Sequence, residues 1–211
     1  MPSMPPPVLP HAPRTPLVTP SAWVARFAAL VPAGEVLDLA CGSGRHARLF
    51  ASLGHPVLAV DRDAAALASL SACGDPGLIT LQIDLEPAPA ELVARQAETA
   101  WPLKAGRFAA IVVTNYLYRS TLAALPSCLA PGGILIYETF ARGNERFGKP
   151  SNPDFLLAPD ELLHLALQAA PPLQVFAFEQ GHVDFPAPAM VQRLCARRPD
   201  DSAAPAALPS I

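Results

Sequence analysis

Short apolar runs alternate with amphipathic windows along most of this chain. Apolar runs of strand length predict buried β-strands over residues 35–40, 57–60, 78–83, 108–113, 134–138, 175–178 and 190–197. Windows with apolar residues three or four positions apart predict helices over residues 22–31, 45–53, 64–72, 91–100, 121–129 and 160–169. The alternation of strand and helix predicts an α/β fold with a mostly parallel, doubly wound sheet.

Residues at the ends of these elements indicate where each one begins or ends. Ser21 and Asp63 stand just before two of the predicted helices, where their side chains can cap free backbone N–H groups. Pro126 lacks a backbone N–H, so it must break or restart the helix over 121–129. The sequence Pro131-Gly132-Gly133 predicts a tight turn into the strand over 134–138.

Proline dominates residues 1–20, and the last residues, 199–211, also lack any periodic pattern. Proline removes backbone donors and disfavours helix in the residue before it, so both ends are expected to be disordered. A proline-rich ligand for a partner protein is the alternative interpretation of the first segment. One domain is therefore expected over residues 21–198.

Composition excludes several classes of protein. The chain has 211 residues and a net charge of -3, which argues against a large nucleic-acid interface. Charges or prolines interrupt every apolar run before the roughly 18 residues that a membrane span needs. The four cysteines are scattered without CxxC spacing, so neither a metal site nor a disulfide framework is expected. With no secretory signal pattern at the N-terminus, we expect a cytoplasmic protein.

The loop after the first strand carries the strongest chemical signal. Gly42 and Gly44 allow a sharp turn and close approach of a ligand, and Ala47 is the third small position of a G-x-G-x-x-A pattern. Dinucleotide-binding enzymes share this pattern. Asp38, inside the strand before the loop, would repel a pyrophosphate and suits a ligand with a cationic amine. Asp61 ends the next strand, where a carboxylate can accept hydrogen bonds from both ribose hydroxyls.

The segment E-V-L-D-L-A-C-G-S-G-R-H resembles motif I of the class I S-adenosylmethionine-dependent methyltransferases. Asp84-Leu85, Thr114-Asn115-Tyr116 and Pro131-Gly132-Gly133 match further landmarks of that family in the same order. The resemblance covers residues 21–197 and is loosely closest to the small tellurite-resistance and thiopurine methyltransferases. It implies a seven-stranded sheet with strand order 3-2-1-4-5-7-6 and an antiparallel strand 7.

The resemblance also implies S-adenosylmethionine as the cofactor and no metal. The binding residues that it implies are Asp38, Ala40, Cys41, Gly42, Gly44, His46, Asp61, Arg62, Asp84, Leu85 and Asn115. Asp38 and loop carbonyls near Ala40 would hold the ammonium, and Arg45, His46 and the following helix would face the carboxylate. Simpler interpretations stay open. Asp61 and Asp84 can be strand-end or turn residues, Cys41 a small filler, and His46 a surface helix residue.

Asn115, Tyr116 and Glu138 are the candidate catalytic residues, with Tyr118 nearby in sequence. Methyl transfer from a sulfonium is an in-line displacement with a neutral leaving group, so positioning supplies much of the catalysis. Asn115 would position the acceptor. Glu138 would be a general base if its pKa were raised by burial, or otherwise a strand-end carboxylate bonded to its surroundings.

The acceptor is expected to be a small molecule, and the sequence leaves the oligomeric state open. Residues 139–157 form a long segment rich in glycine, proline, phenylalanine and basic residues, which we interpret as a substrate lid; a surface excursion is the alternative. Two other functions remain. One is a non-catalytic module that binds S-adenosylmethionine. The other is an NAD(P)-dependent oxidoreductase, which predicts no Asp at position 38 and a catalytic Tyr/Lys or His pair that the sequence does not show.

Overall fold

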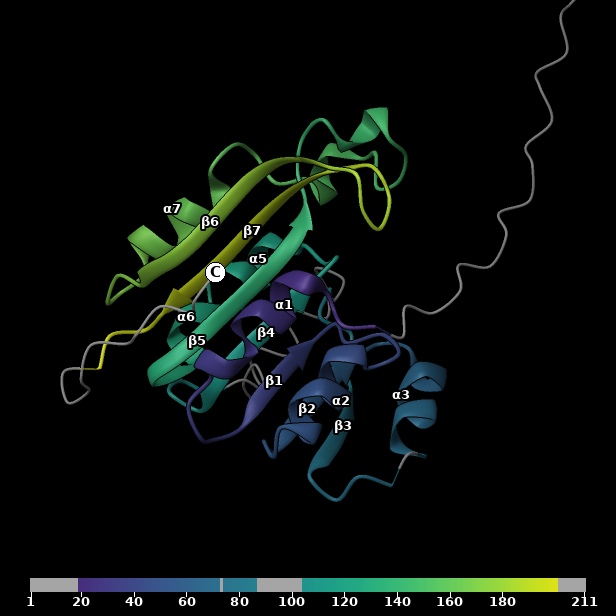
Figure 1. Ribbon diagram of the computed structural model, residues 1–211, viewed down its shortest axis with the longest axis vertical. Coiled ribbons are helices and arrows are strands. Elements are labelled where there is room, and N and C mark those ends of the chain that lie inside the picture. Colours follow the sequence, from purple (N-terminus) through teal and green to yellow (C-terminus); the bar gives the residue numbers. More distant parts are fainter. Residues whose placement is uncertain (1–18, 73, 87–103, 201–211) are drawn as a thin grey trace, which may run out of the picture.

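A single mixed sheet organises the computed structural model, which describes residues 19–72, 74–86 and 104–200 (Figure 1). The strands are β1 (Val36–Leu39), β2 (Val57–Asp61), β3 (Leu78–Gln82), β4 (Phe108–Thr114), β5 (Leu129–Phe140), β6 (Gln174–Val183) and β7 (Ala189–Arg197). The helices are α1 (Ala22–Phe27), α2 (Arg45–Ser52), α3 (Ala64–Ser71), α5 (Arg119–Leu122), α6 (Leu125–Cys128) and α7 (Glu161–Gln168). The short 3₁₀ helices are η1 (Ala28–Leu30), η2 (Asn144–Arg146) and η3 (Pro153–Phe155).

The strand order is β3-β2-β1-β4-β5-β7-β6, and β7 runs antiparallel to both of its neighbours. The predicted fold class and strand order are therefore confirmed. β1 lies between β2 and β4, with Asp38 opposite Ala59 on one side and Val112 on the other. Parallel strands in this arrangement bring the carboxyl ends of β1, β2, β3, β4 and β5 to one edge of the sheet.

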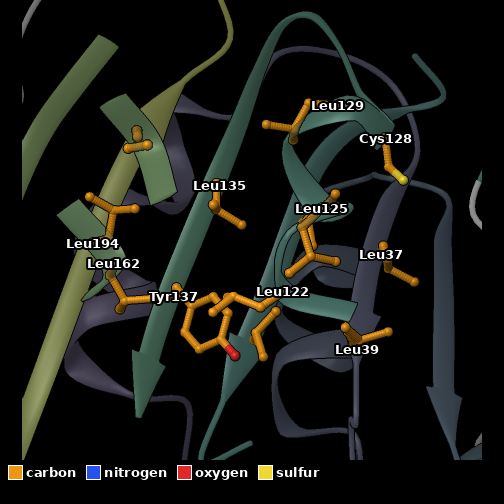
Figure 2. Close-up of a cluster of buried hydrophobic side chains, with 14 of the residues drawn as sticks. Leu37, Leu39, Leu122, Leu125, Cys128, Leu129, Leu135, Tyr137, Leu162 and Leu194 are labelled. Carbon is orange, nitrogen blue, oxygen red and sulfur yellow. The ribbon is translucent and has the colours of Figure 1, made fainter. Parts of the chain in front are cut away.

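Both faces of the sheet are covered, which divides the apolar core in two. Val36 of β1 packs with Trp23, Phe27 and Phe50 on the face covered by α1 and α2. Leu37 and its neighbours pack on the opposite face with α5, α6 and α7, the cluster drawn in Figure 2. This double coverage explains the continuous apolar run of β4, because a parallel strand in the middle of a sheet is buried on both faces.

Three predicted elements differ in detail from the structure. The helix expected over 121–129 is divided into α5 and α6, and Pro126 stands in the first turn of α6 as a restart requires. The expected tight turn at Pro131-Gly132-Gly133 lies inside β5, where the pairing with β4 shifts between Phe108 and Ala110. The strand expected over 175–178 is longer in the structure, Gln174–Val183. Its backbone pairs with antiparallel β7 along this whole length, including the polar residues beyond the apolar run.

Other predictions fall beyond the residues that the structure describes. The helix expected over 91–100, most of the N-terminal segment 1–20 and most of the tail 199–211 belong to this group. Within the described ranges, no helix has the length and apolar character needed to cross a membrane.

We expect Gly133→Ala to destabilise the protein through a clash with backbone. A Cβ at this position would lie 2.7 Å from the Phe108 carbonyl oxygen and 2.9 Å from the Ala130 carbonyl oxygen. Neither oxygen can rotate away, so the loss in free energy of unfolding should be on the order of 1–3 kcal/mol in urea denaturation. Gly77→Ala is the control, since its Cβ would have only ordinary contacts and should change stability by less than about 1 kcal/mol. Equal losses would contradict the clash.

Candidate functional site

The loop between β1 and α2 has a backbone shape that few residues adopt. Ala40, Gly42 and Gly44 have φ angles of 54°, 52° and 74°, in the left-handed region that favours glycine. A Cβ at Gly44 would lie 2.5 Å from Leu70 Cδ2, whereas a Cβ at Gly42 would meet nothing within 4 Å. Gly44 therefore lets the loop pack closely on α3, and Gly42 leaves open space beside the loop for a ligand.

Asp61 joins this loop to the end of β2. Its Oδ2 accepts the Gly42 N–H at 2.7 Å, and its Oδ1 accepts the Asp63 N–H at 2.9 Å. Asp63 in turn caps α3 through the N–H groups of Ala65 and Ala66. Each Asp61 oxygen keeps a further lone pair, so the carboxylate is held in one orientation and can still accept hydrogen bonds from a ligand.

A cavity of about 160 Å³ lies beside Asp61 at the carboxyl edge of the sheet. Its lining residues are Ala40, Asp61, Arg62, Ile83, Asp84, Leu85, Glu86 and Tyr116. The structure thus brings together five of the predicted cofactor residues and one predicted catalytic residue. Ile83 and Glu86 were not predicted from the sequence, although both flank the predicted Asp84-Leu85 pair.

Tyr116 lines the cavity, and a neighbouring side chain holds its backbone in place. The buried Tyr137 hydroxyl donates a hydrogen bond to the Tyr116 carbonyl oxygen at 2.8 Å. The Tyr116 hydroxyl oxygen is itself buried. Burial raises the pKa of Tyr116, and the charge of the nearby Glu86 carboxylate and a hydrogen bond to it raise it further. The phenol therefore stays protonated and is not prepared to be a base.

Asp38 lies beneath the loop, not at its surface. The residue is 1% exposed, and its Oδ2 accepts the Ala47 N–H at 2.8 Å. Burial raises the pKa of this carboxyl to about 7, while the Ala47 hydrogen bond and the Arg45 charge lower it. The carboxylate thus anchors the first turn of α2 under the glycine loop. Its predicted contact with an ammonium stays a prediction.

His46 is a buried link between α2 and its neighbours, not a surface helix residue. It is 1% exposed, its Nε2 accepts the Ser21 N–H at 3.1 Å, and its Nδ1 lies 3.5 Å from Thr114 Oγ1. Because Nε2 accepts, the neutral ring carries its proton on Nδ1. Burial lowers the pKa of His46 to about 3, and the Arg45 charge adds to the effect, so the ring is uncharged near neutral pH.

Glu138, the candidate base, is already bonded on two sides. Its Oε2 accepts the Ser21 hydroxyl at 3.0 Å and lies 3.0 Å from Arg193 Nε. Arg193 faces Glu138 across the β5–β7 pair and also contacts Glu179 at 3.2 Å. These contacts favour the alternative of a strand-end carboxylate with its partners. Asn115 is exposed at the same edge with a φ of 55°.

The segment predicted as a lid, residues 139–157, starts in the last two residues of β5 and is fastened at several points. The Arg119 guanidinium donates to Glu161 Oε1 at 2.8 Å and to the carbonyl oxygens of Asp154 and Leu156 at 2.7 and 2.9 Å. Asn144, 2% exposed, donates to the Pro150 carbonyl and accepts the Met190 N–H. The segment is therefore held to the rest of the fold by hydrogen bonds. Its role toward a substrate stays a prediction.

Cys41 occupies the loop as a buried side chain. Burial raises the pKa of its thiol, and the carboxylates of Asp38 and Asp61 raise it further. A thiol in this environment is a poor nucleophile, because only the thiolate attacks. The contacts favour the interpretation of Cys41 as a small filler.

Comparison with known proteins identifies the family. Residues 16–198 match a family described as a methyltransferase domain. This chain belongs to that methyltransferase family. The chain matches none of the curated proteins with which it was compared.

Solved structures share the fold of this chain at low sequence identity. TehB from Haemophilus influenzae is 17% identical with a TM-score of 0.61, over 83% of this chain and 61% of TehB. The chain thus spans less than two thirds of the length of TehB. An S-adenosylmethionine-dependent methyltransferase from Mesorhizobium loti is also 17% identical with a TM-score of 0.61, over 84% of this chain and 98% of the other. The [4+2]-cyclase SpnF matches at 15% identity and a TM-score of 0.59, over 84% and 78%, so the fold alone does not define the reaction.

The Asp38 carboxyl should make the stability of the folded chain depend on pH. Its pKa is about 7 in the folded chain against 3.8 ordinarily, so between these values the folded state binds more protons than the unfolded state. Stability should therefore fall as pH rises through this window, by up to about 1.4 kcal/mol per pH unit, and level off above it. Asp38→Asn keeps an acceptor for Ala47 and should remove this slope in urea unfolding. If the free energy of unfolding changed with pH in the same way in wild type and Asp38→Asn, the carboxyl would titrate in its ordinary range.

Proposed function

We propose that this chain moves a methyl group from S-adenosylmethionine to a small-molecule acceptor. S-adenosylmethionine is the cofactor implied by membership of the family and by the solved relatives of this fold. The observation that carries the proposal is the Asp61 carboxylate, oriented by two backbone N–H groups at the rim of a cavity beside the open Gly42 position. A carboxylate held in this way suits a pair of ribose hydroxyls.

The residues around the cavity fit the remaining parts of this cofactor. Ile83 and Leu85 supply apolar walls for a purine ring, and Asp84 and Glu86 supply acceptors for its amine. Tyr116 supplies an aromatic wall. The first turn of α2 offers free N–H groups to a carboxylate.

The cofactor, when bound, supplies a methyl group already activated on a sulfonium. The protein then has to bind, orient and shield the reactants. Glu138 is paired with Arg193, and the raised pKa of Tyr116 keeps its phenol protonated. Since the contacts of these two residues single out no general base, we infer an acceptor whose nucleophile needs no proton removed before it attacks, such as a thiolate or a neutral amine. Asn115, exposed at the edge of β4, would position it.

The charge of the chain and the character of the lid segment support a small-molecule acceptor. The net charge of -3 does not favour nucleic acid. The lid segment exposes Phe147 and Phe155, which are 44% and 46% exposed. We propose that this segment borders the acceptor.

Calorimetry with S-adenosylmethionine, S-adenosylhomocysteine and NAD tests the cofactor directly. We expect binding of the first two and none of NAD. Binding of NAD alone would overturn the proposal in favour of the oxidoreductase. Turnover against a panel of thiols, amines and carboxylates then separates an enzyme from a binding module, because a module would bind the cofactor but methylate none of them.

Asp61→Ala should weaken binding of S-adenosylhomocysteine by on the order of 1–3 kcal/mol, because hydrogen bonds to a charged acceptor are lost. Isothermal titration measures the change. Asp75→Ala is the matched control: its carboxylate likewise accepts a backbone N–H, from Gly77 at 3.0 Å, but in a turn outside the cavity. Unchanged affinity in Asp61→Ala would remove the ribose assignment.

A further inference from the structure

Three residues before α1 cross the carboxyl edge of the sheet. We name Thr19, Pro20 and Ser21 the strap. The Thr19 carbonyl accepts a hydrogen bond from Arg45 Nη1 at 3.2 Å, and Ser21 is 9% exposed. The strap therefore contacts the first turn of α2, directly after the glycine loop.

Ser21 uses every polar group that it has. Its N–H donates to His46 Nε2 at 3.1 Å, and its hydroxyl donates to Glu138 Oε2 at 3.0 Å. The same hydroxyl oxygen accepts the Trp23 N–H at 3.1 Å, which caps α1, and the Ser21 carbonyl accepts the Ala25 N–H. Capping α1 requires only the hydroxyl oxygen and the carbonyl. The bonds to His46 and Glu138 are additional and fasten the strap to α2 and β5.

His46 is the centre of this fastening. Its ring joins the strap on one side to Thr114, the last residue of β4, on the other. A buried imidazole that bonds at both nitrogens is not needed to pack α2, where an aliphatic side chain would serve. Its two polar contacts instead tie the strap to the strand end that leads into Asn115.

The strap and the cavity occupy different parts of the same edge. The cavity lies at the ends of β1, β2 and β3 with Tyr116, whereas the strap contacts the ends of β4 and β5 and the start of α2. A cofactor that places its ribose at Asp61 and its carboxylate at the first turn of α2 extends from the cavity toward the strap. The strap is therefore placed to cover the end of the cofactor that carries the reacting sulfur.

We propose that His46 is a positioning residue that latches the strap over the methyl-donating end of the cofactor. It keeps Ser21 in place through Nε2 and keeps the β4 end in place through Nδ1–H. The latched strap slows release of the cofactor and excludes water from the edge between β4 and β5. This role rests on the proposed function, because it requires that the cofactor bind at this edge.

The test compares His46→Leu with His46→Gln in the full chain. Leucine fills similar space without hydrogen bonds, whereas the glutamine oxygen can accept the Ser21 N–H as Nε2 does. We expect His46→Leu to speed hydrogen exchange of the Ser21 amide and dissociation of S-adenosylhomocysteine by about tenfold each, with little change in association rate. His46→Gln should stay within about threefold of wild type in both measurements, as a retained hydrogen bond requires.

A second variant protects the test if His46→Leu fails to fold. Ser21 has a φ of -57°, which proline adopts, so Ser21→Pro removes the N–H that His46 accepts, together with the hydroxyl that caps α1 and bonds Glu138. Ser21→Ala removes the hydroxyl alone, so the difference between these two variants reports the contact with His46. Ser21→Pro should speed dissociation of S-adenosylhomocysteine more than Ser21→Ala does. Ser52→Ala is the control, since Ser52 lies at the other end of α2 and its hydroxyl bonds only locally to the Leu49 carbonyl; it should change nothing.

The outcomes separate this inference from the proposed function. If the Ser21 amide exchanges hydrogen at the same rate in wild type and in His46→Leu, the latch does not exist. If Ser21 exchanges faster but dissociation is unchanged, the strap does not cover the cofactor, and the inference is overturned while the proposed function stands. If S-adenosylhomocysteine fails to bind the wild type at all, the proposed function is overturned, and the role of the strap with it.

Discussion

The hydrogen bond from the Ala47 N–H to the buried Asp38 carboxylate sets the position of α2 over the end of β1. Asp38 lies in the middle of the sheet between β2 and β4, so it is a fixed point. Only the short segment from Ala40 to Gly44 joins this point to the helix, and it turns with three positive φ angles. Asp61 then holds the middle of the loop through Gly42. Two carboxylates thus determine the shape of the surface to which a cofactor would bind.

The polar groups at this edge serve two different purposes. On one side, around the cavity, acceptors keep unused hydrogen-bonding capacity, as at Asp61. On the other side, Ser21 bonds to both His46 and Glu138. Polar groups with hydrogen-bonding sites left over are characteristic of a binding surface, because burying such a group without a partner is costly. Polar groups that already bond to other parts of the protein are characteristic of a structural contact.

Sequence patterns located most of the elements and grouped much of the site. The glycine loop, Asp61 and the Asp84-Leu85 pair come together because each follows a strand whose carboxyl end meets the same edge. The roles of individual side chains were harder to predict. Glu138 has the position expected of a base, but its partners, Arg193 and Ser21, are 55 and 117 residues away along the chain. Neither partner is visible from the local pattern around Glu138.

The sequence by itself determined the fold class, because periodicity shows the alternation of strand and helix, and motifs within single loops carried the family resemblance that implied the order of strands. Only the tertiary structure decided which polar residues line the cavity and which face one another. Asp38 and His46 stand beside the glycine loop in sequence, yet both are 1% exposed and bonded to backbone N–H groups. The physical reason is that burial and hydrogen bonding depend on chain segments that meet only after folding, such as the strap and the end of β4.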